Sequence, residues 1–184
     1  MKSKPVRKYS SPKKHPTRPK VATNKIPVTL RDVFFSSQRG EAVLVLADET
    51  GRRGLPIFVG SWDSRMIAVG LRKDNPRPFT FNFFASILQA IRAELTKVQV
   101  TDLVGNTFHA VACIRAGRSE HQVDARPSDA VALAAVMRRP IFVTEAVLAA
   151  AGKPLTPEGK PPGLPKSSLS TRWIWSDSSG LNAP

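Results

Sequence analysis

Apolar residues in the middle of the chain follow two spacings, one typical of strands and one typical of helices. Runs rich in β-branched and aromatic residues, bounded by turn residues, predict strands at 28–35, 42–47, 55–59, 98–103, 107–115 and 141–143, and a further strand ending at 124. Apolar residues recur at helical spacing after Gly60, after Thr80 and from Pro127 onward, and a short helix ends at Ala151. The mixture predicts a single-domain α+β fold in which a meandering mixed sheet packs against helices.

Two of the predicted helices carry distinctive patterns. Thr80 suits an N-cap, and one face of the following helix is apolar, which predicts that it lies in the core; that face carries Phe81, Phe84, Ala85, Leu88, Ile91 and Leu95. Pro127 suits the first position of the later helix, and Asp129 falls in its first turn, where a negative charge is favourable. Every residue at 130–137 is apolar, so this helix is expected to be buried on almost all sides.

The two ends of the chain differ in composition from the middle. Residues 1–25 hold nine of the 28 basic residues, none of the 14 acidic ones and four prolines, which predicts a disordered basic arm that can grip a polyanion. From Lys153 to Lys166, five of fourteen residues are proline, as expected of a semi-rigid linker, so the chain divides into an arm at 1–25, a domain at 26–152 and a tail at 153–184. Within the tail, Trp173-Ile174-Trp175 is expected to fold back onto the body or onto a neighbouring subunit.

Composition and missing motifs exclude several classes of protein. One cysteine, Cys113, supports neither an internal disulfide nor a cysteine-rich zinc site, which indicates a reducing compartment and predicts a cytoplasmic protein. The longest apolar run has eight residues, too few for a bilayer crossing, so no membrane partner is expected. Glycine-rich nucleotide loops and the common hydrolase motifs are missing. The histidines at 15, 109 and 121 are interpreted as tolerated strand or surface residues, and Cys113 as a small buried apolar group.

The densest group of chemically capable residues lies where a strand meets the buried helix. Within residues 123–130, Asp124, Arg126, Ser128 and Asp129 follow one another closely. Charges beside a buried helix are costly unless they are paired or bind something. One interpretation is structural, with both aspartates capping the helix and pairing with Arg126. The other is functional, with the carboxylates binding a divalent cation while Arg126 holds a phosphate.

This segment also carries a resemblance to a known family. The run Val-Asp-Ala-Arg-Pro-Ser-Asp-Ala at 123–130 resembles the bifunctional nuclease family, together with Leu-Pro-Ile-Phe-Val-Gly at 55–60, Arg-Pro-Phe-Thr at 77–80 and Pro-Ile-Phe-Val at 140–143. The likeness covers about residues 28–150. It implies an α+β domain that self-associates and acts on DNA and RNA. Within the matching motifs, we predict substrate contacts at Arg77, Thr80 and Ser128, in addition to Arg126.

The chain departs from the family pattern at three places. The family usually continues Arg-Pro-x-Thr with His-Asp-Leu, whereas Thr80 is followed here by Phe81-Asn82-Phe83. The usual Glu-Ala after the Gly60 turn is replaced by Asp63-Ser64, and the usual Thr-Phe-Tyr-Ala by residues 107–110, where histidine replaces the tyrosine. Asn82 can ligate a metal through its carbonyl oxygen, but it cannot act as a base. If the missing histidine was the base, cleavage should be weak or absent.

Three hypotheses of different classes follow. The first is a metal-assisted nuclease: Asp124, Asp129, Asp63 and Asn82 hold Mg²⁺ or Mn²⁺, while Asp124, Asp129 and Arg126 form the catalytic group and Arg126 contacts the phosphate. The second is a non-catalytic homo-oligomer that binds nucleic acid or regulates. The third is an assembly scaffold in which the acidic junction is only structural. The first requires that the two aspartates flanking Arg126 lie close enough to share one ligand.

Overall fold

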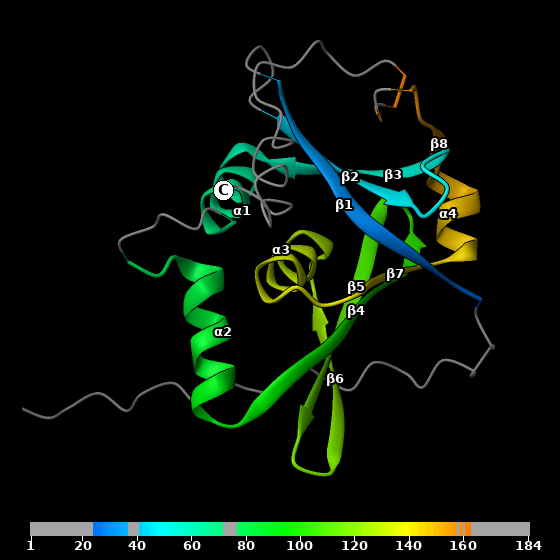
Figure 1. The fold of residues 1–184 in the computed structure, drawn as a ribbon. Helices are drawn as coiled ribbons and strands as arrows, with labels where there is room; N and C mark the ends of the chain where they lie inside the picture. Colours follow the sequence, from blue (N-terminus) through cyan, green and yellow to red (C-terminus); the bar gives the residue numbers. More distant parts are fainter. Residues whose placement is uncertain (1–23, 37–40, 72–76, 158, 160, 163–184) are drawn as a thin grey trace, which may run out of the picture.

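The computed structural model describes residues 24–36, 41–71, 77–157, 159, 161 and 162, and this part of the chain forms one eight-stranded sheet with four helices (Figure 1). The strands are β1 (Lys25–Ser36), β2 (Glu41–Asp48), β3 (Arg53–Gly60), β4 (Ala93–Val104), β5 (Thr107–Ala116), β6 (Ser119–Ala125), β7 (Ile141–Thr144) and β8 (Lys153–Pro154). The helices are α1 (Ser61–Gly70), α2 (Thr80–Ala90), α3 (Pro127–Met137) and α4 (Glu145–Ala151). The predicted α+β fold is confirmed. Nearly all of the basic arm and the tryptophans at 173 and 175 lie outside the described residues.

The sheet is mixed, with strand order β6-β5-β4-β7-β1-β2-β3-β8. Only the β4–β7 pair among these strands is parallel; the other pairs are antiparallel. Strand β8 pairs with β3 beyond residue 152, where the linker was expected to begin. Leu155 then packs against a small apolar cluster of Phe34, Val43 and Val45. The described fold therefore continues past the expected boundary.

Helix α3 forms the centre of the core. It contacts β3, β4 and β5 as well as α1 and α2, so the sheet curves around it (Figure 1). Its buried residues are Pro127, Ser128, Ala130, Val131, Ala132, Ala134 and Ala135. Four of these are alanines, whose small side chains let the helix approach its neighbours closely. The predicted burial on almost all sides is confirmed. Because Pro127 and Ser128 are among the buried residues, packing also holds the N-terminal turn of α3 in place.

Helix α2 differs from the prediction. The apolar face expected in the core is only partly buried: Phe81 is buried, but Phe84 is 51% and Ile91 65% exposed. The helix ends at Ala90, and Leu95 belongs to β4, where it is fully buried. Ile91 and Leu95 are four residues apart, which is a helical spacing, although the helix has already ended. Spacing alone does not show where a helix ends. Thr80 is the first helical residue, not the N-cap, a position that Phe79 occupies.

Candidate functional site

The site is built at the junction between β6 and α3. Arg126 is the N-cap of α3 and has an extended backbone, with φ −64° and ψ 142°. Pro127 requires this, because a proline disfavours the helical conformation in the residue before it. Asp129 lies in the first turn of α3, three positions after Arg126. The turn therefore places the side chains of Arg126 and Asp129 at the same helix end.

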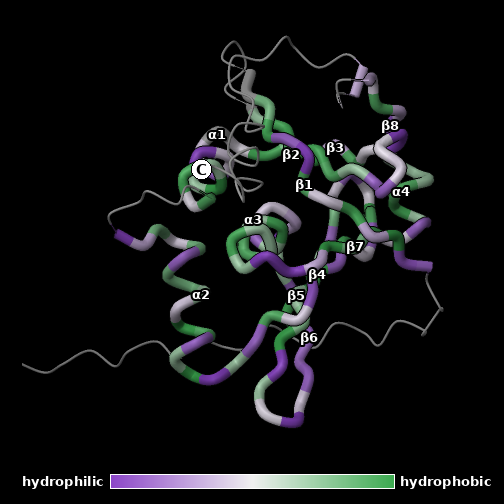
Figure 2. The backbone as a smooth tube through the Cα atoms, in the orientation of Figure 1, coloured by the Kyte–Doolittle hydropathy of each residue, from purple (hydrophilic) through white to green (hydrophobic). Residues whose placement is uncertain are grey.

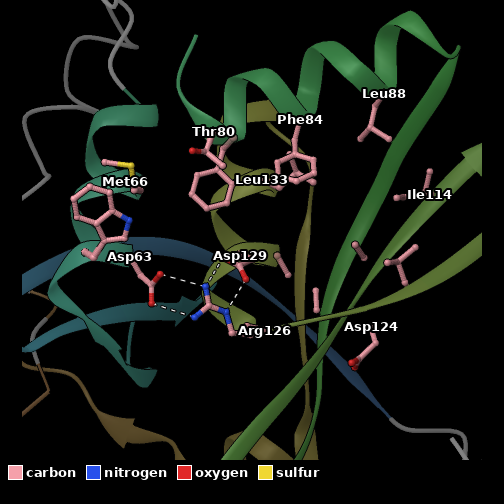
Figure 3. Close-up of a pocket in the computed structure, with 16 residues that line it drawn as sticks. Asp63, Met66, Thr80, Phe84, Leu88, Ile114, Asp124, Arg126, Asp129 and Leu133 are labelled. Atoms are coloured by element: carbon pink, nitrogen blue, oxygen red, sulfur yellow. Dashed lines mark hydrogen bonds and ion pairs between the residues drawn. The ribbon is translucent and has the colours of Figure 1, made fainter. Parts of the chain in front are cut away.

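Arg126 bridges two carboxylates, and we call Asp63, Arg126 and Asp129 the triad (Figure 3). Its Nε donates to Asp129 Oδ2 at 2.8 Å and its Nη2 to Asp129 Oδ1 at 3.1 Å. Toward α1, Nη2 donates to Asp63 Oδ1 at 3.2 Å and Nη1 to Asp63 Oδ2 at 3.3 Å. Each carboxylate is thus held by two hydrogen bonds, and the guanidinium joins α1 to α3.

The triad carries a formal charge of minus one, because two carboxylates surround one guanidinium. Hydrogen bonding and charge from Asp129, followed by those from Asp63, raise the pKa of Arg126 above its ordinary value. The Arg126 side chain is nevertheless 63% exposed. An incoming ligand can therefore reach the guanidinium from solvent.

The triad lies at the wall of a cavity of about 770 Å³ between α1, α2, α3, β5 and β6. Most of the lining is apolar, and it comes from Trp62, Met66, Phe81, Phe84, Leu88, Ala112, Ile114, Val123, Ala125, Ala130 and Leu133. The polar lining is Asp63, Thr80, Asp124, Arg126 and Asp129. Sequence analysis missed this apolar wall, because helical spacing was interpreted only as core packing; the signal was Trp62 directly before Asp63.

Asp124 does not join the triad. It is an exposed residue of β6 that lines the cavity, and Figure 3 shows it apart from the Arg126 guanidinium. Among the described residues, no hydrogen bond or ion pair links it to Arg126 or Asp129. The chain turns into α3 at Arg126, which directs Asp129 toward α1 and leaves Asp124 on the sheet. The structure therefore does not bring Asp124 to Arg126, where Asp63 provides the second carboxylate beside Asp129. The catalytic and metal-binding roles of Asp124 stay predictions from the sequence.

The other expected site residues divide between the cavity and the rest of the fold. Thr80 lines the cavity, whereas Ser128 is buried in the first turn of α3. Arg77 is exposed ahead of α2 and is not part of the lining. Asn82 faces the end of α1, where its Nδ2 donates to the Gly70 carbonyl oxygen at 3.2 Å. The structure does not bring Asn82 to the two aspartates.

A divalent cation at the triad would compete with Arg126 for the two carboxylates. All four carboxylate oxygens of Asp63 and Asp129 accept hydrogen bonds from Arg126. A cation that bound these oxygens would either displace the guanidinium or lie close to its positive charge. In the part of the chain that the structure describes, no three acidic, histidine or cysteine side chains gather closely enough to hold a metal. The predicted metal set of Asp124, Asp129, Asp63 and Asn82 is therefore not assembled.

Among the described residues, no histidine or cysteine lines the cavity. His109 is half-buried on β5 and His121 is exposed on β6, and neither lines it. Cys113 is buried, as predicted, and its Sγ accepts a hydrogen bond from Gln99 Nε2 at 3.3 Å.

Within the described residues, no helix is both long enough and apolar enough to cross a membrane.

Comparison with known proteins places this cavity inside a matched region. The family model described as the bifunctional nuclease domain matches residues 44–156, which include all three triad residues. Two uncharacterized proteins of Mycobacterium tuberculosis, from strains CDC 1551 and H37Rv, are each 36% identical to the chain over 115 residues. Each match covers 62% of this chain and 68% of the relative.

Proposed function

The chain belongs to the bifunctional nuclease domain family, and on that premise we propose that it hydrolyses phosphodiester bonds of DNA and RNA at the triad. The observation that carries the proposal is an accessible guanidinium held between two carboxylates at the wall of an open cavity. Guanidinium groups recognise phosphate through paired hydrogen bonds, and carboxylates are general bases for water. The triad supplies both groups within one cluster.

Arg126 is the phosphate-binding residue in this proposal. Its guanidinium has five N–H donors, and the bonds to the two aspartates use four of them. A phosphate oxygen can accept from the fifth, and further contacts require it to replace one carboxylate. Asp63 is the more readily replaced, since its hydrogen bonds of 3.2 and 3.3 Å are longer than the 2.8 and 3.1 Å bonds of Asp129.

Replacement by phosphate leaves the Asp63 carboxylate beside the bound diester. It can then accept a proton from a water molecule as the water oxygen forms a bond to phosphorus. The bond from phosphorus to the leaving oxygen breaks, and that oxygen takes a proton from solvent. Asp129 acts as a positioning residue, because it keeps Nε and Nη2 of Arg126 oriented. No step passes through Mg²⁺ or Mn²⁺, whose involvement stays a prediction from the sequence.

Asp63→Asn is expected to lower cleavage of plasmid DNA and single-stranded RNA by about 10²- to 10⁴-fold, the usual contribution of a general base. The change keeps the size of the side chain and removes its basicity. Initial rates are compared with those of Asp124→Asn, which should remain near wild type. Equal rates for Asp63→Asn and wild type would contradict the assignment. Activity that disappears with chelator and returns with Mn²⁺ would replace this scheme with a metal-assisted one.

A second candidate function is a nucleic-acid-binding or regulatory homo-oligomer without cleavage. The specific observation is the apolar surface that α2 leaves uncovered, formed by Phe79, Phe83, Phe84, Ile87 and Ile91, which are 37% to 65% exposed. Adjacent apolar side chains of this kind are typical of surfaces that bind another protein. A second copy of the chain is the occupant that the family resemblance suggests.

If α2 forms that interface, Phe83→Glu is expected to shift the protein toward monomer, because the introduced carboxylate would be buried without a partner. Phe83 is 57% exposed and does not line the cavity. Sedimentation velocity over a range of protein concentrations measures the shift. Gln89→Glu, which adds the same charge on an exposed position of α2, is the control. A wild-type protein that is monomeric at every concentration would contradict self-association.

A further inference from the structure

Basic side chains gather where the turn of the β5–β6 hairpin lies near the start of β4 and the end of α3. We call this group the basic end, and it consists of Arg92, Lys97, Arg115, Arg118, Arg138 and Arg139. Figure 2 shows hydrophilic residues along the outer part of the hairpin and around the passage from α2 to β4. The register places Glu94 opposite Arg115 and Arg115 opposite Glu120, so these strands carry their charges side by side.

Two carboxylates neutralise only part of the basic end. Glu94 pairs with Arg139 at 3.0 Å and with Arg115 at 3.6 Å. Glu120 lies 3.9 Å from the Lys97 ammonium. Six basic groups against two acidic ones leave a formal excess of four positive charges. The triad, by contrast, carries a net negative charge, so of these two groups the basic end is the one that attracts a polyanion.

Two arginines of this group occupy unusual backbone positions. Arg92 and Arg138 have φ of 55° and 53°, and they are the only non-glycine residues of the described chain with positive φ. Arg92 follows the end of α2, and Arg138 is the C-cap of α3. Glycine is strongly favoured at helix ends in this conformation because it has no Cβ. Retaining arginine at both positions costs stability, and such costs concentrate at functional sites.

The cavity extends from the triad toward the basic end. Arg126 lines it at the start of α3 and Ile114 lines it on β5, whereas none of the six basic side chains belongs to the lining. Along β5 the path runs from Ala110, opposite Ala125, to Ala116 at the hairpin turn, six residues or about 20 Å. That length matches about six stacked nucleotides at 3.4 Å each. Trp62 and Phe84 line the cavity and offer aromatic faces on which unpaired bases can stack.

We propose that the basic end binds the phosphates of single-stranded DNA or RNA, and that the strand then runs along the cavity to Arg126. This inference rests on the proposed nuclease function and adds the substrate class and its direction of entry. A single strand is favoured over a duplex, because only unpaired bases can turn toward the apolar wall. Glu94 and Glu120 pair with the other three basic residues of the group, so Arg92, Arg118 and Arg138 are the arginines that can bind phosphate.

The test measures binding of a fluorescent, cleavage-resistant phosphorothioate oligothymidylate of about twelve nucleotides, twice the estimated span. Every variant keeps the full chain, including the N-terminal basic arm. In the double variant Arg92→Gly, Arg138→Gly, the slope of log affinity against log salt should fall by about 1.4, at about 0.7 per phosphate contact on a single strand. Its thermal midpoint should be unchanged or higher, because glycine relieves the backbone strain.

Two further variants keep the result interpretable. The control is the double variant Arg52→Gln, Lys153→Gln. It removes two positive charges near the β3–β8 edge of the sheet and should leave the salt slope unchanged. Arg118→Gln, in the hairpin turn, should lower the slope by about 0.7 even if the glycine variant fails to fold. An unchanged slope in both Arg118→Gln and the glycine variant would overturn the proposal. Wild-type binding to anionic phospholipid vesicles, without binding to the oligonucleotide, would also overturn it.

Cleavage of a small diester separates this inference from the proposed function. Bis(4-nitrophenyl) phosphate is too short to reach from the triad to the basic end. Its hydrolysis therefore reports on the triad alone, and Asp63→Asn should lose it, whereas the Arg52→Gln, Lys153→Gln control should keep the wild-type rate. Absence of hydrolysis by wild type, together with a reduced salt slope in the glycine variant, would remove the nuclease function but keep the binding surface.

Discussion

Replacing Arg126 by alanine is expected to reduce cleavage of DNA and RNA by about 10²- to 10³-fold or more, the usual effect of losing one preorganised donor to the developing charge. The substitution also removes the guanidinium that pairs with both Asp63 and Asp129, and leaves the two carboxylates without a positive charge between them. Their combined negative charge would then repel the phosphate. Because the Arg126 side chain is 63% exposed, the core should remain packed. Initial rates on labelled single-stranded RNA and on plasmid DNA measure the effect.

Two controls define what an Arg126 result means. Arg126→Lys keeps the charge but cannot make paired hydrogen bonds to two carboxylates, so it should recover only part of the activity. Arg65→Ala removes an exposed arginine of α1 outside the cavity lining and should behave as wild type. If Arg126→Ala cleaves at the wild-type rate, the reaction occurs elsewhere in the molecule or in a contaminant.

Leu95→Ala is expected to lower the free energy of unfolding by about 2–5 kcal/mol. Leu95 is fully buried on β4 and belongs to the same apolar cluster as the α3 residues Val131 and Ala134. The substitution removes apolar contacts and leaves a cavity that the sheet and α3 can only partly close. At about 2–4 °C per kcal/mol for a chain of this size, the thermal midpoint should fall by roughly 4–20 °C. Urea denaturation monitored by circular dichroism gives the free energy directly.

Val104→Ala is the matched control for that measurement. Val104 lies on the same strand but is 50% exposed, so the change should stay within about 0.5 kcal/mol. Similar losses for both variants would show that β4 is not the inner strand that its burial pattern indicates.

The parts of the site that are close in sequence could be predicted. Arg126 and Asp129 are three residues apart across a helix N-terminus marked by Pro127, so their pairing follows from local geometry. The Asp63–Arg126 contact joins residues 63 positions apart and depends on how α1 packs beside α3. Spacing alone does not contain that information. Asp63 entered the prediction only through the family resemblance.

The largest error concerns which surfaces cover one another. Periodicity indicated correctly that the segment after Thr80 is an amphipathic helix, but it cannot show whether a neighbouring element packs on the apolar side. Phe81 is buried, whereas Phe84 and Ile91 are exposed. The same limitation applies to Asp124, since alternation along β6 does not reveal where the chain turns away from the sheet. Both features are set by tertiary packing, which overrides local pattern.

Nuclear magnetic resonance can show directly whether a phosphodiester displaces the Asp63 carboxylate from the Arg126 guanidinium. The Arg126 side-chain signal of ¹⁵N-labelled protein is assigned by its loss in Arg126→Lys and followed during titration with the cleavage-resistant oligothymidylate. A saturable shift of this signal, at the same oligonucleotide concentrations that shift Arg138, is the expected result. An Arg126 signal that does not move when the oligonucleotide is saturating would contradict phosphate binding at the triad.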